Sequence, residues 1–174
     1  MRNTMSSSRA ALIAAGLLAG LGIAYLCPHQ PTYATTADRD ANRFMMVTVP
    51  VGNRAAGIDD PIDGVFILDF LTGQLKGAVM NRQLAKFNAF YIRNLAQDFG
   101  VKGDADEQHY CMVTGYAQMP SAGAATFASG MLYIGEETSG RVNAYTFPWN
   151  ENGTGGVVEC VLVDTFPWKA PSRK

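Results

Sequence analysis

Hydrophobic positions divide the chain into a leader and a long β-type region. Residues 10–26 carry no charge and consist mainly of Ala, Leu, Gly and Ile. After residue 43 the pattern changes to short runs of β-branched and aromatic residues, separated by Gly, Asn, Asp and Pro. Such runs are typical of strands that are joined by tight turns. The sequence therefore predicts a hydrophobic leader followed by a β-rich domain.

Seven strand signals lie in the β-type region. The links LTGQ and ETSGR contain a glycine, which accepts the positive φ of a tight turn without steric cost. The predicted strands are 44–51, 64–70, 74–80, 109–117, 130–135, 141–147 and 157–166.

An internal similarity at an offset of 66 residues indicates a duplication. Aligning 44–72 with the residues 66 positions later gives seven identities over 29 positions, including Met46-Val47-Thr48 on Met112-Val113-Thr114. Self-similarity at a fixed period is the usual signature of repeated units. We therefore interpret the domain as two related halves.

The segment 81–100 is ambiguous. Its apolar residues are spaced to form one face of a helix, and Gly100 would end that helix. The second half, however, ends in a strand, so the repeat favours a strand at 86–92 and a short helix around 93–99. We expect the strand, with the helix as the alternative.

The expected fold class is mainly β. Two four-stranded antiparallel meanders in tandem, a pseudo-repeat of about 66 residues, would form a sandwich or a small barrel with one short linking helix. The β domain would cover 44–168, with halves 44–100 and 110–168. A linker at 35–43 would precede it, and a tail at 169–174 would follow it.

Residues 1–34 are predicted to be an export signal or a single membrane anchor. Arg2 and Arg9 precede the uncharged stretch 10–26, and a polar segment suited to cleavage after Ala34 follows it. An uncleaved anchor is the alternative, since small residues recur at Gly16, Gly20 and Ala24. Either interpretation predicts export across the cytoplasmic membrane, to the periplasm or cell envelope, anchored or secreted.

Charge narrows the choice of partners. The chain has 14 basic and 15 acidic residues, with no long basic run, which disfavours nucleic acid. The remaining candidate partners are the membrane, through an uncleaved leader, and a protein partner or a second copy of the chain. After the leader two cysteines are left, Cys111 and Cys160, and outside the cytoplasm they are candidates for a disulfide. Two buried free thiols are the alternative.

Few residues after the leader have catalytic potential. His109 is the one histidine there, and a nucleophile–histidine–acid site would have to use it. It opens a predicted strand with no nucleophile-elbow motif nearby, so we interpret it as a strand-end side chain. Asp104, Asp106 and Glu107 do not follow the EF-hand spacing and are read as a solvated loop. We predict no catalytic residue, no metal and no cofactor.

Five residues are candidates for binding. Asp59, Asp60 and Asp63 lie in an acidic turn, and Trp149 and Trp168 each end a Thr-Phe-Pro-Trp sequence. Exposed tryptophans supply large contact areas, but the sequence favours a role for both as hydrophobic plugs over the ends of the core. The two copies of the tetrapeptide need not form one site.

Two resemblances accompany these patterns. The segment LDFLTGQL (68–75) resembles the hairpin of a quinoprotein-type β-propeller blade, but the chain has room for two blades where a propeller needs about four. The pieces FMMVTV, GVFILDFLTGQLKGAVMN and LYIGEETSGRVNAYTFPWN are similar to exported proteins of planctomycete-type bacteria. The second resemblance implies an exported setting and no mechanism.

The sequence therefore favours an exported, non-catalytic β domain for recognition or assembly at the cell envelope. One alternative is a small-ligand-binding domain with a cleft between its halves, which would need an apolar pocket with convergent polar groups. The other alternative is a hydrolase that uses His109.

Overall fold

The computed structural model describes residues 12–20, 37–40, 43–52, 62–101, 109–117, 119–120, 126–150 and 152–169. The chain divides into two units, residues 1–32 and 33–174. In the first unit, residues 12–20 are helical. Among the helices described, none combines the length and the apolar character that crossing a membrane requires. The rest of the predicted leader lies outside the described residues.

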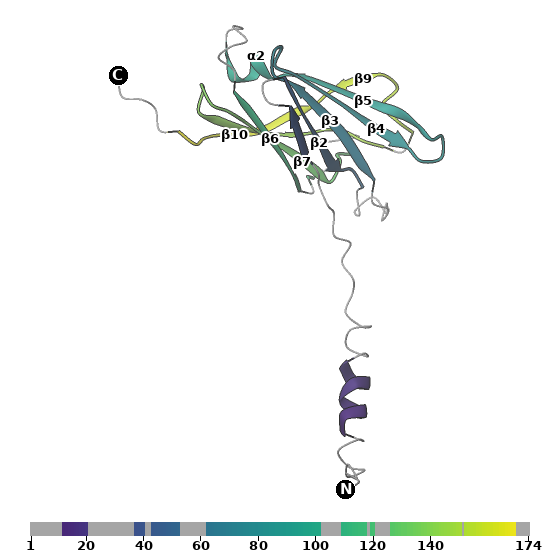
Figure 1. The fold of residues 1–174 in the computed structure, drawn as a ribbon. Helices are drawn as coiled ribbons and strands as arrows, with labels where there is room; N and C mark the ends of the chain where they lie inside the picture. The colour runs from purple at the N-terminus through teal and green to yellow at the C-terminus, as the bar shows by residue number, and fades with distance from the viewer. Residues whose placement is uncertain are drawn as a thin grey trace. The chain divides into compact units, whose positions relative to one another are not determined.

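The second unit is mainly β and consists of two sheets (Figure 1). The larger sheet has six strands in the order β1-β2-β3-β4-β5-β9, and the smaller has four in the order β10-β8-β7-β6. The two sheets remain separate, so the arrangement is a sandwich and not a closed barrel. The strands of the first sheet are β1 (Ala37–Asp40), β2 (Phe44–Pro50), β3 (Asp63–Asp69), β4 (Gln74–Asn81), β5 (Lys86–Asn94) and β9 (Val157–Glu159). Those of the second are β6 (Tyr110–Tyr116), β7 (Gly130–Glu136), β8 (Arg141–Thr146) and β10 (Val161–Pro167).

Each half of the domain supplies one antiparallel meander, which confirms the predicted fold class. Strands β2 to β5 pair in sequence order, and β6, β7, β8 and β10 do the same in the other sheet. Tight hairpins join β3 to β4, β4 to β5 and β7 to β8, whereas longer segments join β2 to β3, β6 to β7 and β8 to β10.

The ambiguous segment is a strand followed by a short helix. β5 covers 86–94, and its Ala89 and Tyr91 side chains are buried on the inner face. The helix α2 (Leu95–Phe99) then begins, capped by the Asn94 side chain and ended by Gly100. The expectation of a strand at 86–92 is confirmed, and a helix over the whole of 81–100 is excluded.

Two details differ from the prediction. The run 157–166, expected as one strand, divides at Cys160 into β9, which pairs in parallel with β5, and β10, which pairs with β8. The amide of Cys160 donates to the carbonyl of Ile92 at the point where the chain passes between the sheets. The predicted linker at 35–43 contains β1, which pairs with β2. The pairing of β9 with β5 joins segments far apart in the chain and leaves no local sequence signal. β1 pairs with the adjacent β2, but its polar sequence ADRD is not typical of a strand.

The 66-residue similarity does not match equivalent positions in the two sheets. Met46 is 40% exposed, but Met112 is completely buried; Val47 is 2% exposed, but Val113 is 61% exposed. Side chains alternate between the faces of a strand, so a shift of one residue exchanges inside and outside. The two meanders therefore share their strand order, but the aligned residues of β2 and β6 face opposite ways.

The hairpins of the two halves are built alike. The Asp69 carboxylate accepts a hydrogen bond from the hydroxyl of Thr72 at 2.8 Å, and Glu136 accepts one from the amide of Ser139. Each acceptor is followed four residues later by a glycine with positive φ, which the tight turn requires. These glycines are Gly73 (φ 64°) and Gly140 (φ 63°). The turn chemistry expected from the sequence is thus present in both links.

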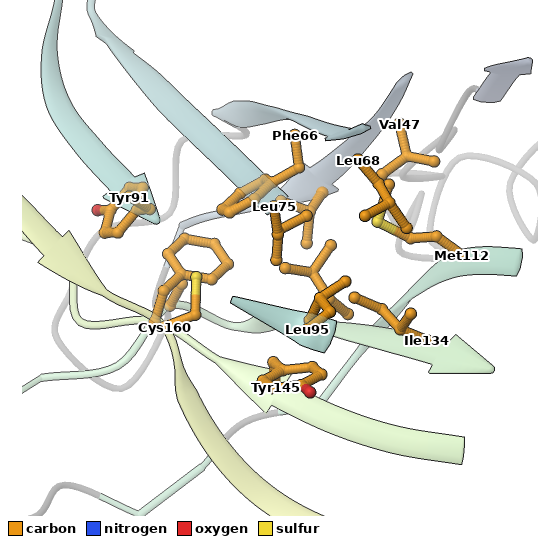
Figure 2. Packing of buried hydrophobic residues seen from close by; sticks show 14 of the residues in the cluster. Val47, Phe66, Leu68, Leu75, Tyr91, Leu95, Met112, Ile134, Tyr145 and Cys160 are labelled. Carbon is orange, nitrogen blue, oxygen red and sulfur yellow. The ribbon is translucent and has the colours of Figure 1, made fainter. Parts of the chain in front are cut away.

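The core lies between the sheets and draws side chains from both (Figure 2). Phe66 from β3 packs with its ring centroid 4.9 Å from that of Phe147, and Phe147 lies 4.9 Å from Tyr91. The hydroxyl of Thr114 on β6 donates to the carbonyl of Thr48 on β2, so these two strands also meet. Aromatic burial on this scale is the main source of stability for a small sandwich.

Gly77 on β4 provides a test of this packing. A Cβ at this position would overlap the ring of Phe66. We expect Gly77→Ala to lower the free energy of unfolding by about 1–3 kcal/mol, because overpacking forces the core to shift. Chemical denaturation of the variant measures the effect.

The control is Gly156→Ala, since nothing lies within 4 Å of a Cβ there and the backbone is not in the left-handed region. We expect that change to cost less than about 0.5 kcal/mol. Adding Phe66→Leu to Gly77→Ala should make the combined loss smaller than the sum of the two. Equal losses for the two glycine variants would contradict the packing described.

Candidate functional site

The outward-facing side of the six-stranded sheet carries an apolar patch. On β3, Phe66 and Leu68 point into the core, so Ile67 between them points outward and is 41% exposed. Met46 on β2 lies directly opposite Ile67. In the next row, neighbouring positions on β3, β4, β5 and β9 again carry apolar side chains. We call the following set the outer face: Met46, Val65, Ile67, Ala78, Met80, Phe87, Phe90, Ile92 and Val157.

Six of these nine side chains are at least 40% exposed, namely Met46, Ile67, Met80, Phe87, Phe90 and Val157. Three charged positions, Asp38, Lys76 and Glu159, fall in the register row of Met46, Ile67 and Ile92. The next row, which runs through Val65, Ala78, Phe90 and Val157, contains no charged residue. An antiparallel sheet that faces water on one side normally alternates apolar and polar residues. A contiguous exposed apolar surface instead marks a contact surface.

The outer face was not predicted from the sequence, although a signal for it was present. The runs FMMVTV and GVFILDF are apolar at consecutive positions, and not at alternate ones. Consecutive apolar residues indicate a strand that is covered on both sides. In the sequence, these two apolar runs serve only to predict strands.

A hollow of about 260 Å³ lies between the halves, and four of its nine lining residues are amides. Asn81, Gln83 and Asn88 come from the β4–β5 hairpin region, and Trp149 and Asn152 come from the segment between β8 and β9. Trp149 is only 5% exposed. Its indole therefore belongs to the core and offers no open face for a ligand to stack on. The hollow carries no assignment of a ligand class.

The predicted binding residues do not form one site. Trp168 is 49% exposed and lies beside His109, away from Trp149. Asp63 begins β3 and is exposed, and desolvation raises the pKa of its carboxyl above the usual range. Asp59 and Asp60 lie outside the described residues. Trp149 thus serves as a plug of the core, and Trp168 remains an exposed aromatic side chain.

His109 shares a shallow hollow with Cys111, Glu137 and Trp168. Its carbonyl accepts the amide hydrogen of Glu137 at 3.0 Å. Within the part of the chain that the structure describes, its imidazole makes no hydrogen bond. A general base must reach the proton that it removes, so this geometry offers His109 no activated nucleophile. The acidic residues 104–107 lie outside the described residues. Elsewhere in the described ranges, no three His, Cys, Asp or Glu side chains are placed to hold a metal ion.

An ion-pair network links α2 to both sheets. Arg93 donates two hydrogen bonds of 2.7 Å to the Asp98 carboxylate, and Tyr145 donates to the same carboxylate at 2.9 Å. The hydrogen bond with Asp98 holds the pKa of Arg93 above its usual range. The sequence offered no signal for this cluster, since Asp98 and Tyr145 are far apart in the chain. Its groups are already paired with one another, so its role is structural.

Both described cysteines are free thiols. Cys111 is exposed on β6, whereas Cys160 is completely buried between β9 and β10. The predicted Cys111–Cys160 disulfide is therefore not present in the structure. Cys111 lies on β6 at one edge of the four-stranded sheet, and Cys160 directly precedes β10 at its other edge, with β8 and β7 between these edges.

Comparison with known proteins gives no match: no family model fits the chain, and no curated protein or solved structure is similar to it.

The two thiols should differ strongly in reactivity. Burial raises the pKa of Cys160 to about 12, and we expect its thiol to resist alkylation by iodoacetamide in the native protein. Cys111 should be modified readily under the same conditions. Peptide mapping by mass spectrometry distinguishes the sites. Guanidinium should expose Cys160 and make the two rates similar.

The raised pKa also has a consequence for stability. Because the folded-state pKa exceeds that of the unfolded thiol, the contribution of neutral Cys160 is present at neutral pH and is lost as the pH rises toward 12. A Cys160→Ala variant should show a weaker loss over that range. Rapid alkylation of Cys160 in the native protein would contradict the placement of these thiols. A Cys111 thiol that reacts only after treatment with a reductant would contradict it too.

Proposed function

We propose that this protein is an exported, non-catalytic β domain that recognises or assembles with another protein at the cell envelope. The observation that carries the proposal is the outer face, where apolar side chains remain exposed across five adjacent strands of the sheet. Export is supported by the sequence of the leader, with Arg2 and Arg9 before an uncharged stretch.

The chemistry of the outer face suits a protein partner. The surface is formed by strands held in register, so its side chains are positioned before any partner arrives. Aromatic and methionine side chains such as Phe87, Phe90 and Met80 are enriched at the centres of protein interfaces. A preformed surface of this kind loses little conformational entropy on binding.

Electrostatics supports the same choice. After the leader, 12 basic residues stand against 15 acidic ones, so the domain is weakly negative. A negative domain gains nothing from the anionic surface of a membrane. On a protein partner, a carboxylate or a carbonyl oxygen could accept a hydrogen bond from Lys76, which lies at the middle of one row.

The test is photocrosslinking of the full chain in its native cells. p-Benzoylphenylalanine replaces Phe90 on the outer face in one strain and Leu71 in another. Leu71 is a matched control, because it is 56% exposed but lies in the β3–β4 turn. We expect a discrete adduct from position 90 and none of the same mass from position 71.

Adding Ile67→Lys should reduce the position-90 adduct at least about tenfold, because a charge at the centre of an apolar contact is costly. Since Ile67 is exposed, thermal unfolding should change little. The proposal fails if a folded chain gives no adduct from position 90, or if the Ile67→Lys chain crosslinks as well as the wild type.

A further inference from the structure

A thiol and an imidazole lie on the same face of the chain at the start of β6. Strand β6 pairs with β7, so that Cys111 lies opposite Gly135. The amide of Glu137 donates to the carbonyl of His109, which continues this pairing one step before the strand. Side chains at alternate positions of an extended chain point to one face. The His109 and Cys111 side chains therefore point the same way.

Burial agrees with this alternation. Tyr110, between the two, is 2% exposed and belongs to the core, whereas His109 and Cys111 are exposed. Both exposed side chains line one shallow hollow. The sulfur of Cys111 lies over Gly135 there, because a Cβ on that glycine would be 2.8 Å from it. The missing side chain of Gly135 thus keeps the space beside the thiol open.

In the described part of the chain, both donor groups are available. The Cys111 thiol forms no disulfide there, and neither it nor the His109 imidazole makes a hydrogen bond or an ion pair with the described residues. Cα atoms two residues apart in a strand are separated by about 6.6 Å. Metal–sulfur and metal–nitrogen bonds of about 2.3 and 2.0 Å set the two donor atoms about 4 Å apart across one ion. Two side chains with this spacing can reach that separation.

The number of ligands selects the metal. Glu137 also lines the hollow, but its carboxylate contacts the ammonium of Lys169 at 3.5 Å. Among the described residues, no three His, Cys, Asp or Glu side chains are placed to hold an ion together. Zinc sites take three or four protein ligands. Thiolates instead select Cu(I), imidazole also suits copper, and Cu(I) forms stable complexes with two ligands.

Charge agrees with this choice of ion. The ion pair of Glu137 and Lys169 is neutral in sum, and a thiol that coordinates a metal is deprotonated. A bound Cu(I) ion cancels the negative charge of the Cys111 thiolate. A divalent ion would leave an uncompensated positive charge beside the ammonium of Lys169.

We propose that His109 and Cys111 bind one Cu(I) ion as a two-ligand site beside β7. The sequence alone predicts no metal, because a His-x-Cys spacing gives neighbouring ligands only where the chain is extended. This inference goes beyond the proposed function, since β6 belongs to the four-stranded sheet and the outer face belongs to the other one.

The first experiment measures the affinity of the full chain for Cu(I) in a mild non-ionic detergent. Cu(I) is supplied as its bicinchoninate complex in anaerobic buffer with ascorbate. The parent chain carries Cys27→Ser and His29→Ala, which remove the thiol and the imidazole of the leader. We expect one ion per parent chain. Because even an outer-shell partner is worth about 10–100-fold in metal affinity, the dissociation constant should rise at least about tenfold in His109→Ala and in Cys111→Ser.

Glu137→Gln is the matched control, because Glu137 lines the same hollow but is not a ligand of the proposed ion. We expect this variant to bind Cu(I) as tightly as the parent chain. Since His109, Cys111 and Glu137 are all exposed, thermal unfolding of the metal-free variants should change little, which separates a lost ligand from a lost fold. Zn(II) at equal concentration should not displace Cu(I).

The second experiment identifies the ligands by X-ray absorption at the copper edge. We expect one sulfur and one nitrogen around the ion in the parent chain, and loss of that nitrogen in His109→Ala. Two sulfur ligands would mean that the ion joins the thiols of two chains, which overturns the proposal.

The affinities have outcomes that would overturn it as well. If His109→Ala binds Cu(I) as tightly as the parent chain, the site is an exposed thiol alone. If Glu137→Gln loses as much affinity as His109→Ala, or if Zn(II) displaces Cu(I), the two-ligand assignment is wrong. None of these outcomes involves Phe90 or Ile67, so they leave the outer-face proposal to its own test.

Discussion

The rings of Phe66, Tyr91 and Phe147 hold the two sheets together, and most of the structure depends on this contact. Phe66 and Tyr91 come from β3 and β5 of the first sheet, and Phe147 directly follows β8 of the second. The Tyr91 hydroxyl donates to the carbonyl of Pro148 at 2.9 Å, which fixes the chain beyond β8. Because these rings must face inward, Ile67, Phe90 and Ile92 must face outward. The same constraint that forms the core therefore creates the outer face.

Local patterns in the sequence were sufficient for the meanders. Runs of β-branched and aromatic residues, with turn residues between them, predict β3 and β4 and the glycine-ended hairpin that joins them, and the short helix near 93–99 is confirmed as α2. What depends on distant partners could not be predicted. The run 157–166 has no turn residue at Cys160, yet the chain changes sheet there because the Ile92 carbonyl binds its amide. The polar sequence of β1 gave no strand signal either.

The candidate sites show the same division. Sequence identified Trp149 and Trp168 as equivalent, but burial separates them, since one fills the core and the other is exposed. The similarity at 66 residues matched Met46 with Met112, although the two point to opposite sides of their sheets. The pairing register decides which face of the sheet a side chain points to, and a shift of one residue reverses that face. The outer face was readable in principle from consecutive apolar residues, but only the structure shows that nothing among the described residues covers it.

The central claim is that the outer face is covered by a protein partner in the cell. The most direct measurement is the rate of methionine oxidation in native cells, read by mass spectrometry at Met46 and Met80, which are 40% and 44% exposed in the structure. Completely buried Met112 serves as the internal reference. Covered methionines should be oxidised several-fold more slowly in the wild-type chain than in Ile67→Lys. Equal rates at Met46 and Met80 in the two chains would contradict the account.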